Sequence, residues 1–158
     1  INVTGAETAI EAIDYLLGSR EVGENVAVIG GGLTGCEIAY DLYLKGKHPT
    51  IIEMQDDLIT TKGICLANTS YLRDFFKTNK VPVFLETSLS QIKSGSVELI
   101  DKTGNQFALP ADSVIMSVGY TPAPIAAKGK HIHVIGDAAK VGNLRTVIWG
   151  AWDVCMKL

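Results

Sequence analysis

Three glycines and one glutamate have types and spacing that could do binding chemistry. The segment Gly30–Gly35 reads G-x-G-x-x-G, and it follows a short run of β-formers at residues 26–29. Gly30 lets the chain leave a strand sharply, Gly32 lets the backbone approach a pyrophosphate, and Gly35 lets helix and strand pack closely. The first turn of the helix that follows presents unpaired N–H groups and the positive end of its dipole. The pattern therefore predicts a phosphate-binding turn.

An acidic residue completes this pattern. Glu53 closes a second apolar segment at residues 50–52, and it follows the turn at close to the spacing of about 20 residues typical of dinucleotide sites. Its carboxylate could accept hydrogen bonds from both hydroxyls of an adenosine ribose. Met54 and Gln55 offer no cation to a 2′-phosphate, so the pattern favours NAD(H). The alternative is a glycine-rich turn that binds nothing, and the strand–helix–strand frame argues against it.

Composition narrows the possible partners. The chain has 158 residues and a formal net charge of −3, with acidic and basic residues mixed. This balance gives no electrostatic reason to expect nucleic acid or an anionic membrane as a partner. No apolar run reaches the length of a membrane span and no signal peptide is apparent, so we expect a cytoplasmic protein. The sequence begins at Ile1 without an initiator methionine, which suggests a fragment of a longer protein or a trimmed one.

Other reactive side chains form no convincing site. The cysteines form no C-x-x-C pair, which argues against a metal site or redox disulfide: they are Cys36, Cys65 and Cys155. A helix dipole near Cys36 could lower the pKa of its thiol, but packing of a small residue is the preferred interpretation. The histidines lack a carboxylate or cysteine at useful spacing: they are His48, His131 and His133. We read Asp56-Asp57 as a solvated loop, and predict neither a catalytic residue nor a metal.

The elements that must position the glycine turn follow from periodicity. Thr4-Gly5-Ala6-Glu7 is typical of a capping box, which predicts one helix over residues 5–18. The remaining expected elements of the first half are a helix Thr34–Leu44 stopped by Gly46, a loop Gln55–Asn68, a helix Tyr71–Lys80 and a parallel strand Pro82–Leu85.

The second half has a different pattern. Three short segments with turn residues between them predict an antiparallel meander: Ser88–Lys93, Ser96–Asp101 and Gln106–Leu109. Ser113–Ser117 returns as a buried strand, and His131–Ile135 is predicted as another. Apolar spacing predicts a terminal amphipathic helix that buries one stripe: Leu144, Val147, Ile148, Ala151, Cys155 and Leu158. Trp149 and Trp152 then point away from that stripe.

With these segments in order, the chain resembles the two-dinucleotide-binding-domain flavoproteins of the glutathione-reductase-like class. It looks most like their 2-enoate reductase and 2,4-dienoyl-CoA reductase branch. Three motifs carry the resemblance: VAVIGGGLTGCEIAYDLYLKG, DSVIMSVGYTP and HVIGDAAKVGNLRTVIWGAWDVCMKL. It implies an α/β, Rossmann-like FAD/NAD(P)-binding fold of three layers: a central parallel sheet, helices on one side and an antiparallel β-meander on the other.

The same resemblance implies the cofactors and partners. It implies hydride transfer from NADH to a flavin, with electrons passing on to a site that saturates a C=C bond. FAD would bind only with a missing part of the flavin domain, while FMN and an iron–sulfur cluster belong to the parent enzyme. The expected division is an N-terminal helix and connector (1–24), an NAD(H)-binding domain (25–122) and a remnant of the flavin-binding domain (123–158). The remaining parent enzyme, and a second copy of the chain, are the expected partners.

Motif and resemblance together define a candidate cofactor-binding set. Glu37 enters it as typical of the nicotinamide-binding domain, and Asp137 as a contact to flavin ribitol or pyrophosphate. The set is Gly30, Gly31, Gly32, Leu33, Thr34, Gly35, Glu37, Glu53, Met54, Val118, Gly119, Gly136 and Asp137. Two other functions stay open: a non-catalytic adenine-nucleotide-binding module, and an S-adenosylmethionine-dependent methyltransferase, which would have a seven-stranded sheet without a meander.

Overall fold

A five-stranded parallel sheet lies at the centre of the first of two units, residues 1–118. The computed structural model describes residues 2–61 and 63–157. In spatial order the parallel strands are β1 (Ile10–Glu11), β8 (Ser113–Met116), β2 (Asn25–Ile29), β3 (His48–Ile52) and β4 (Val83–Phe84). An antiparallel meander consists of β5 (Thr87–Lys93), β6 (Ser96–Asp101) and β7 (Gln106–Pro110). The helices of this unit are α1 (Ala12–Leu16), α2 (Leu33–Leu44) and α3 (Leu66–Thr78).

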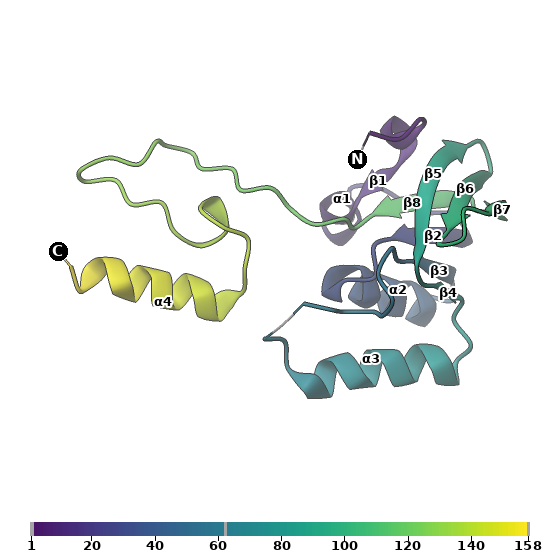
Figure 1. The fold of residues 1–158 in the computed structure, drawn as a ribbon, viewed down its shortest axis with the longest axis horizontal. Coiled ribbons are helices and arrows are strands. Elements are labelled where there is room, and N and C mark those ends of the chain that lie inside the picture. The colour runs from purple at the N-terminus through teal and green to yellow at the C-terminus, as the bar shows by residue number, and fades with distance from the viewer. Residues whose placement is uncertain (1, 62, 158) are drawn as a thin grey trace. The chain divides into compact units, whose positions relative to one another are not determined.

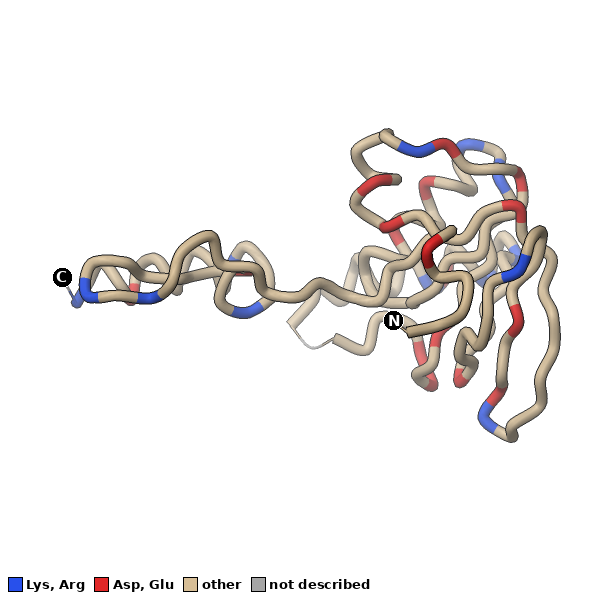
Figure 2. The backbone as a smooth tube through the Cα atoms, turned by 90° about the horizontal axis from the view of Figure 1, so that it is seen from above, with Lys and Arg blue, Asp and Glu red and all other residues tan. Residues whose placement is uncertain are grey.

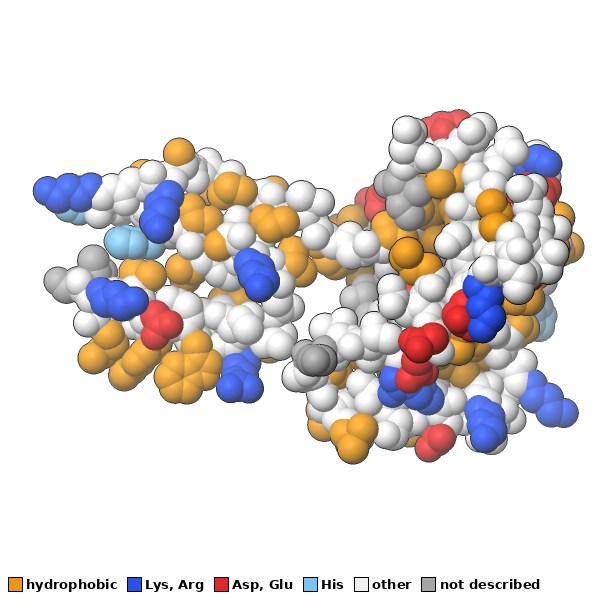
Figure 3. Space-filling view, in the orientation of Figure 1, with side chains coloured by type: hydrophobic (Ala, Val, Ile, Leu, Met, Phe, Trp, Pro, Cys, Tyr) orange, Lys and Arg blue, Asp and Glu red, His pale blue; other side chains and the backbone are white. Residues whose placement is uncertain are grey.

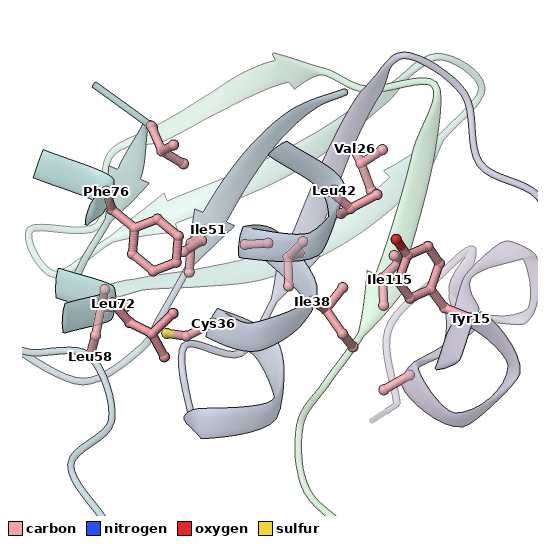
Figure 4. Packing of buried hydrophobic residues seen from close by; sticks show 14 of the residues in the cluster. Tyr15, Val26, Cys36, Ile38, Leu42, Ile51, Leu58, Leu72, Phe76 and Ile115 are labelled. Carbon is pink, nitrogen blue, oxygen red and sulfur yellow. The ribbon is translucent and has the colours of Figure 1, made fainter. Parts of the chain in front are cut away.

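Alternate residues of the parallel strands face two different cores. Val26 and Val28 of β2 pack in the core on the helix side, whereas Ala27 and Ile29 pack in the core on the meander side. In Figure 1, α2 and α3 lie on one side of the sheet. Figure 4 shows Phe76 of α3 beside Ile51 of β3 in the helix-side core. The predicted three-layer α/β fold is confirmed.

The first predicted helix, over residues 5–18, is wrong. The segment contains a short 3-10 turn η1 (Ala6–Thr8), then β1, and only then α1. Gly5 has φ 84, no side chain caps η1, and the Ile92 N–H donates to the Thr4 carbonyl at 2.9 Å. Pairing of Ile10 with Ile115 of β8 and contact with the meander outweigh the helical periodicity. Both give backbone N–H and C=O groups of this segment hydrogen-bond partners outside it.

Most other predicted elements of this unit are confirmed to within a few residues. The meander and β8 match closely, and α2 begins one residue early, at Leu33. Helix α3 begins at Leu66, so the predicted loop Gln55–Asn68 ends earlier than expected. Thr69 is buried on the inner face of α3. Because this residue is polar, it interrupts the apolar spacing that predicts a helix, so the first turns were not predicted.

The second unit, residues 119–158, contains a 3-10 turn η2 (Gly136–Ala138) and α4 (Leu144–Cys155). The predicted strand His131–Ile135 is wrong: its one pairing among the described residues is an isolated bridge from Ile132 to Gly129. No strand lies beside it in the described part of this unit, so its backbone has no ladder to join.

Helix α4 does not bury the predicted stripe. Leu144, Ile148 and Cys155 are exposed, while Val147, Gly150, Ala151 and Val154 are half-buried beside η2. Trp149 and Trp152 are 57% and 56% exposed. The predicted contribution of Leu158 lies outside the described residues. In Figure 3, hydrophobic side chains gather on the visible face of this helix.

Acidic and basic residues are not segregated along the chain. Figure 2 shows acidic and basic residues interspersed along the chain. Within the described residues, none of the helices is both long and apolar enough to cross a membrane.

Candidate dinucleotide site

The glycine turn lies where β2 ends and α2 begins. Gly30 has φ 104, and a Cβ there would overlap the carbonyl oxygen of Ser117. A Cβ at Gly35 would overlap the carbonyl oxygen of Gly30. These two glycines therefore allow the turn, α2 and the end of β8 to pack against one another, as the sequence predicts.

Gly32 has a different environment. A Cβ at this position would meet nothing within 4 Å, and its φ of −67 suits any residue. Gly32 is also the N-cap of α2, and no side chain caps that end. The first N–H groups of a helix have no acceptor within the helix, so the open space before Gly32 faces unpaired donors and a positive dipole end. A pyrophosphate fits this arrangement, since a side chain at Gly32 would fill the cradle.

Glu53 is fixed by two backbone donors. Its Oε2 accepts a hydrogen bond from the Gly31 N–H at 2.5 Å, and its Oε1 accepts one from the Gln55 N–H at 2.7 Å. The residue is only 9% exposed. A carboxylate has about four acceptor positions, and these donors use two of them. The carboxylate therefore ties the glycine turn to the end of β3, a role that the sequence pattern did not reveal.

Both backbone polar groups of Gly31 are hydrogen-bonded. Its carbonyl accepts a hydrogen bond from the Ile59 N–H at 2.8 Å, and its N–H donates to Glu53. Ile59 has φ 52, which is strained for a β-branched residue. Arg73 of α3 donates to both Asp57 oxygens, at 3.2 and 3.0 Å, and to the carbonyl of Leu58. We call residues 57–59 with Arg73 the loop clamp.

Cys36 is a packing residue. Its side chain is fully buried, and the Sγ lies 3.4 Å from the Gly31 carbonyl oxygen. Burial raises the pKa of this thiol to about 12. It is therefore protonated at neutral pH, and the preferred interpretation from sequence is supported over an activated thiol.

The other members of the candidate set occupy several positions. Leu33 and Thr34 form the first turn of α2, Glu37 is exposed on the next turn, and Val118 leaves β8 beside Gly30. Gly119, Gly136 and Asp137 belong to the second unit. There the Asp137 Oδ1 accepts a hydrogen bond from the Gly142 N–H at 3.0 Å, and Gly136 packs against Val147 of α4.

A surface pocket begins at Met54, directly after Glu53. Its lining residues come from three segments of the first unit: Met54, Gln55, Asp56, Glu86, Ser88, Ile100, Asp101 and Lys102. Lys102 is a cation in this pocket that the local sequence around Glu53 could not reveal, because it directly follows β6. Among the described residues, no group of histidine, cysteine and acidic side chains is arranged to hold a metal.

A glycine turn at the carboxyl ends of parallel strands, with a meander on the opposite face from the helices, defines a Rossmann-like FAD/NAD(P)-binding fold. The chain belongs to the pyridine nucleotide-disulphide oxidoreductase family, whose profile matches residues 3–148. It is thus a pyridine-nucleotide-binding oxidoreductase domain. The five-stranded sheet with its meander differs from the seven-stranded sheet that a methyltransferase would require.

Two relatives match almost the whole chain. Cinnamate reductase of Clostridium sporogenes is 34% identical over all of this chain and 24% of its own length. NADH oxidase of Thermoanaerobacter brockii is 30% identical over 99% of this chain and 26% of its own length. The chain therefore spans about a quarter of the curated relatives that it matches.

Solved structures agree on the fold. A 2-naphthoyl-CoA reductase complex superposes with a TM-score of 0.86 at 22% identity, over all of this chain and 25% of that one. Bacillithiol disulfide reductase of Staphylococcus aureus gives 0.63 at 20% identity, over 77% of this chain and 36% of that one.

Proposed function

We propose that this domain binds NADH and positions it for hydride transfer to a flavin held by the rest of a longer polypeptide. The observation that carries the proposal is the open space at Gly32, in front of the α2 N-terminus. The other two glycines of the motif are explained by packing inside the chain, whereas Gly32 is not. A ligand that approaches the backbone closely accounts for it.

Each residue of the site has a binding role in this proposal. The N–H groups of the first α2 turn donate to the pyrophosphate. The Gly31 and Gln55 N–H groups hold the Glu53 carboxylate in one orientation, so its remaining lone pairs are preorganised for the ribose hydroxyls. The nicotinamide supplies the hydride when bound, and the protein supplies position and electrostatics. No acid, base or nucleophile of this chain is required.

We further propose that the longer protein reduces a C=C bond. One relative is named cinnamate reductase, and one structural match is a 2-naphthoyl-CoA reductase. FAD, FMN and an iron–sulfur cluster, carried elsewhere in the polypeptide, are part of this proposal. Asp137 would contact the FAD once the rest of the flavin-binding domain is present.

Cofactor choice provides the direct test. Calorimetric titration of the chain should show tight binding of NADH and binding of NADPH weaker by about 5- to 150-fold, from hydrogen bonds worth about 1–3 kcal/mol to the charged Glu53. Equal affinities would contradict the role of Glu53, and no binding of either would contradict the proposal itself. A non-catalytic nucleotide module would bind NADH but leave the flavin of the full-length protein oxidised, whereas a reductase would bleach it.

A further inference from the structure

The pocket that begins at Met54 is held in a fixed position relative to Glu53. The Thr87 N–H donates to the Glu53 carbonyl at 2.9 Å, and the Glu86 N–H donates to the Gln55 carbonyl at 2.8 Å. Glu86 itself has φ 50, a left-handed conformation that is uncommon for a residue other than glycine. These backbone hydrogen bonds therefore hold Glu86 beside the segment that follows Glu53, the residue whose carboxylate is the predicted ribose acceptor.

The pocket contains three carboxylates and one amine. Its charged lining residues are Asp56, Glu86, Asp101 and Lys102. The Lys102 Nζ lies 2.5 Å from the Glu86 Oε2, and this contact raises the pKa of the lysine, with smaller contributions from Asp101 and Asp56. All three carboxylates therefore act on the same amine.

Asp101 stays ionised at neutral pH. Its Oδ1 accepts hydrogen bonds from the Thr103 hydroxyl and from the N–H groups of Thr103 and Asn105. The bond from the Thr103 hydroxyl is the main reason that the pKa of Asp101 is lowered to about 2. Its lining residues among those the structure describes therefore carry a net negative charge, and the one cation among them, Lys102, is already paired with Glu86.

We propose that this pocket receives the 2′ side of the adenosine ribose and rejects a 2′-phosphate, with Glu86 as the residue that determines this specificity. The proposal rests on the proposed function, because it takes Glu53 as the ribose acceptor. Glu86 acts by neutralising the positive charge of Lys102, which would otherwise bind the phosphate. Lys102 could therefore bind the 2′-phosphate of NADPH, but its charge is neutralised by Glu86. This effect adds to the repulsion of the phosphate by Glu53.

Removing the Glu86 charge tests the proposal. In Glu86→Gln, Lys102 loses its partner and the pocket becomes less negative, so the ratio of NADPH to NADH affinity should rise about tenfold, as close opposite charges at interfaces allow. The double variant Glu86→Gln/Lys102→Met should lose this gain, because the freed amine is absent. Asp56→Asn, at an exposed loop position, should raise the same ratio by a smaller factor.

Glu98→Gln is the matched control. Glu98 pairs with Lys93 at 2.9 Å on the same meander, outside the pocket, so its loss changes the net charge equally. Its affinity ratio should equal that of the wild type. Calorimetry with NADH, NADPH and 2′-AMP gives the ratios, and urea unfolding confirms that each variant is folded.

The outcomes separate this inference from the proposed function. If the wild type binds NADH but Glu86→Gln and Asp56→Asn change the ratio no more than Glu98→Gln does, the role of the pocket is overturned while the site stands. A gain that persists in the double variant overturns the role of Lys102. If the wild type and every variant bind neither nucleotide, the proposed function fails and the inference fails with it.

Discussion

The glycines of the turn differ in what a side chain at each would meet. At Gly30 and Gly35 an added Cβ collides with backbone oxygens of this chain, and at Gly31 it meets Leu58 and Glu53. Only at Gly32 is the added atom free of internal contacts. Substitutions at Gly30 and Gly35 are therefore expected to act on folding, and substitution at Gly32 on binding.

Gly32→Val should weaken NADH binding by at least about tenfold while the chain stays folded, because its methyl groups occupy pyrophosphate space. Some loss of stability, about 1 kcal/mol, is expected from a poor N-cap residue. Titration with NADH and far-ultraviolet circular dichroism check both parts. Gly35→Val is the contrast and should fail to fold; normal NADH binding by Gly32→Val would show that the site is elsewhere.

Glu53→Gln tests the structural role of the carboxylate. An amide offers one acceptor oxygen where the carboxylate offers two, so either the buried Gly31 N–H or the partly buried Gln55 N–H loses its partner. The free energy of unfolding should fall by about 1–3 kcal/mol. Urea denaturation measures it, with the exposed Glu37→Gln as control. Equal midpoints for the two variants would mean that these hydrogen bonds contribute nothing.

At this scale the packing roles of Gly30 and Gly35 could be predicted, because both act within one strand–helix–strand unit. The binding role of the turn and of Glu53 stays a prediction, based on the fixed spacing that a dinucleotide needs. The pairing of Lys102 with Glu86 was not predicted, because it depends on the register of β5 against β6, in which the adjacent Thr87 pairs with Asp101. The second hydrogen-bonding role of Glu53 was missed because it depends on where a backbone N–H points.

At the scale of elements, the loop clamp connects α3 to the glycine turn. Arg73 holds Asp57 and Leu58, and the neighbouring Ile59 donates to Gly31 from a strained conformation. A strained backbone conformation persists when neighbouring contacts enforce it. For Ile59 these contacts are the hydrogen bonds of the loop clamp and the burial of its own side chain. The position of the turn thus depends on α3, a helix outside the strand–helix–strand unit that contains the turn.

Asp57→Asn should show a pH-dependent loss of stability. The Arg73 guanidinium holds the pKa of the Asp57 carboxyl below its usual range. The stabilisation of the folded state by ionised Asp57 is therefore fully present above the ordinary aspartate pKa of about 3.9. It is lost as the pH falls through the lowered pKa of the folded state. Because the pair is partly exposed, at most about 1 kcal/mol is expected.

Urea midpoints measured between about pH 2 and pH 7 check this prediction. The difference between wild type and Asp57→Asn should be constant near neutrality and vanish at the acid end. Asp74→Asn, at an exposed position of α3, should show no such convergence. A difference that grows with falling pH would contradict the assigned sign.

Elements were predictable where their own residues specify them. The meander has alternation and turn residues of its own, so its three strands were found in place. Residues 5–18 have helical spacing, but Ile10 and Glu11 pair with β8, which lies about a hundred residues further along. Such tertiary pairing cannot be read from the spacing of one segment.

At the scale of the whole molecule, the two units differ in how they are stabilised. Every buried residue of the described chain lies in the first unit, and α4 buries none. A chain that ends at Val118 should therefore retain the thermal midpoint of the whole chain to within about 4 °C. Differential scanning calorimetry checks this, and a much lower midpoint would show that the second unit stabilises the first.

The purified chain should be colourless and should not oxidise NADH when FAD or FMN is added. Its sequence has one G-x-G-x-x-G turn, which the proposed function assigns to the nicotinamide dinucleotide. The exposed tryptophans of α4 are expected to lie against the rest of the flavin-binding domain, since each carries a large apolar area. A yellow preparation with stoichiometric flavin would contradict both expectations.

The place of β8 between β1 and β2 has a consequence for how the chain folds. Asn25 and Asp112, which hydrogen-bond at the start of these neighbouring strands, are 87 positions apart in the chain. Closing a loop of that length costs about 4 kcal/mol of entropy before β8 docks. During synthesis, β2 therefore has an unpaired apolar edge until the meander and β8 have left the ribosome. The nascent chain is most exposed to aggregation in this interval.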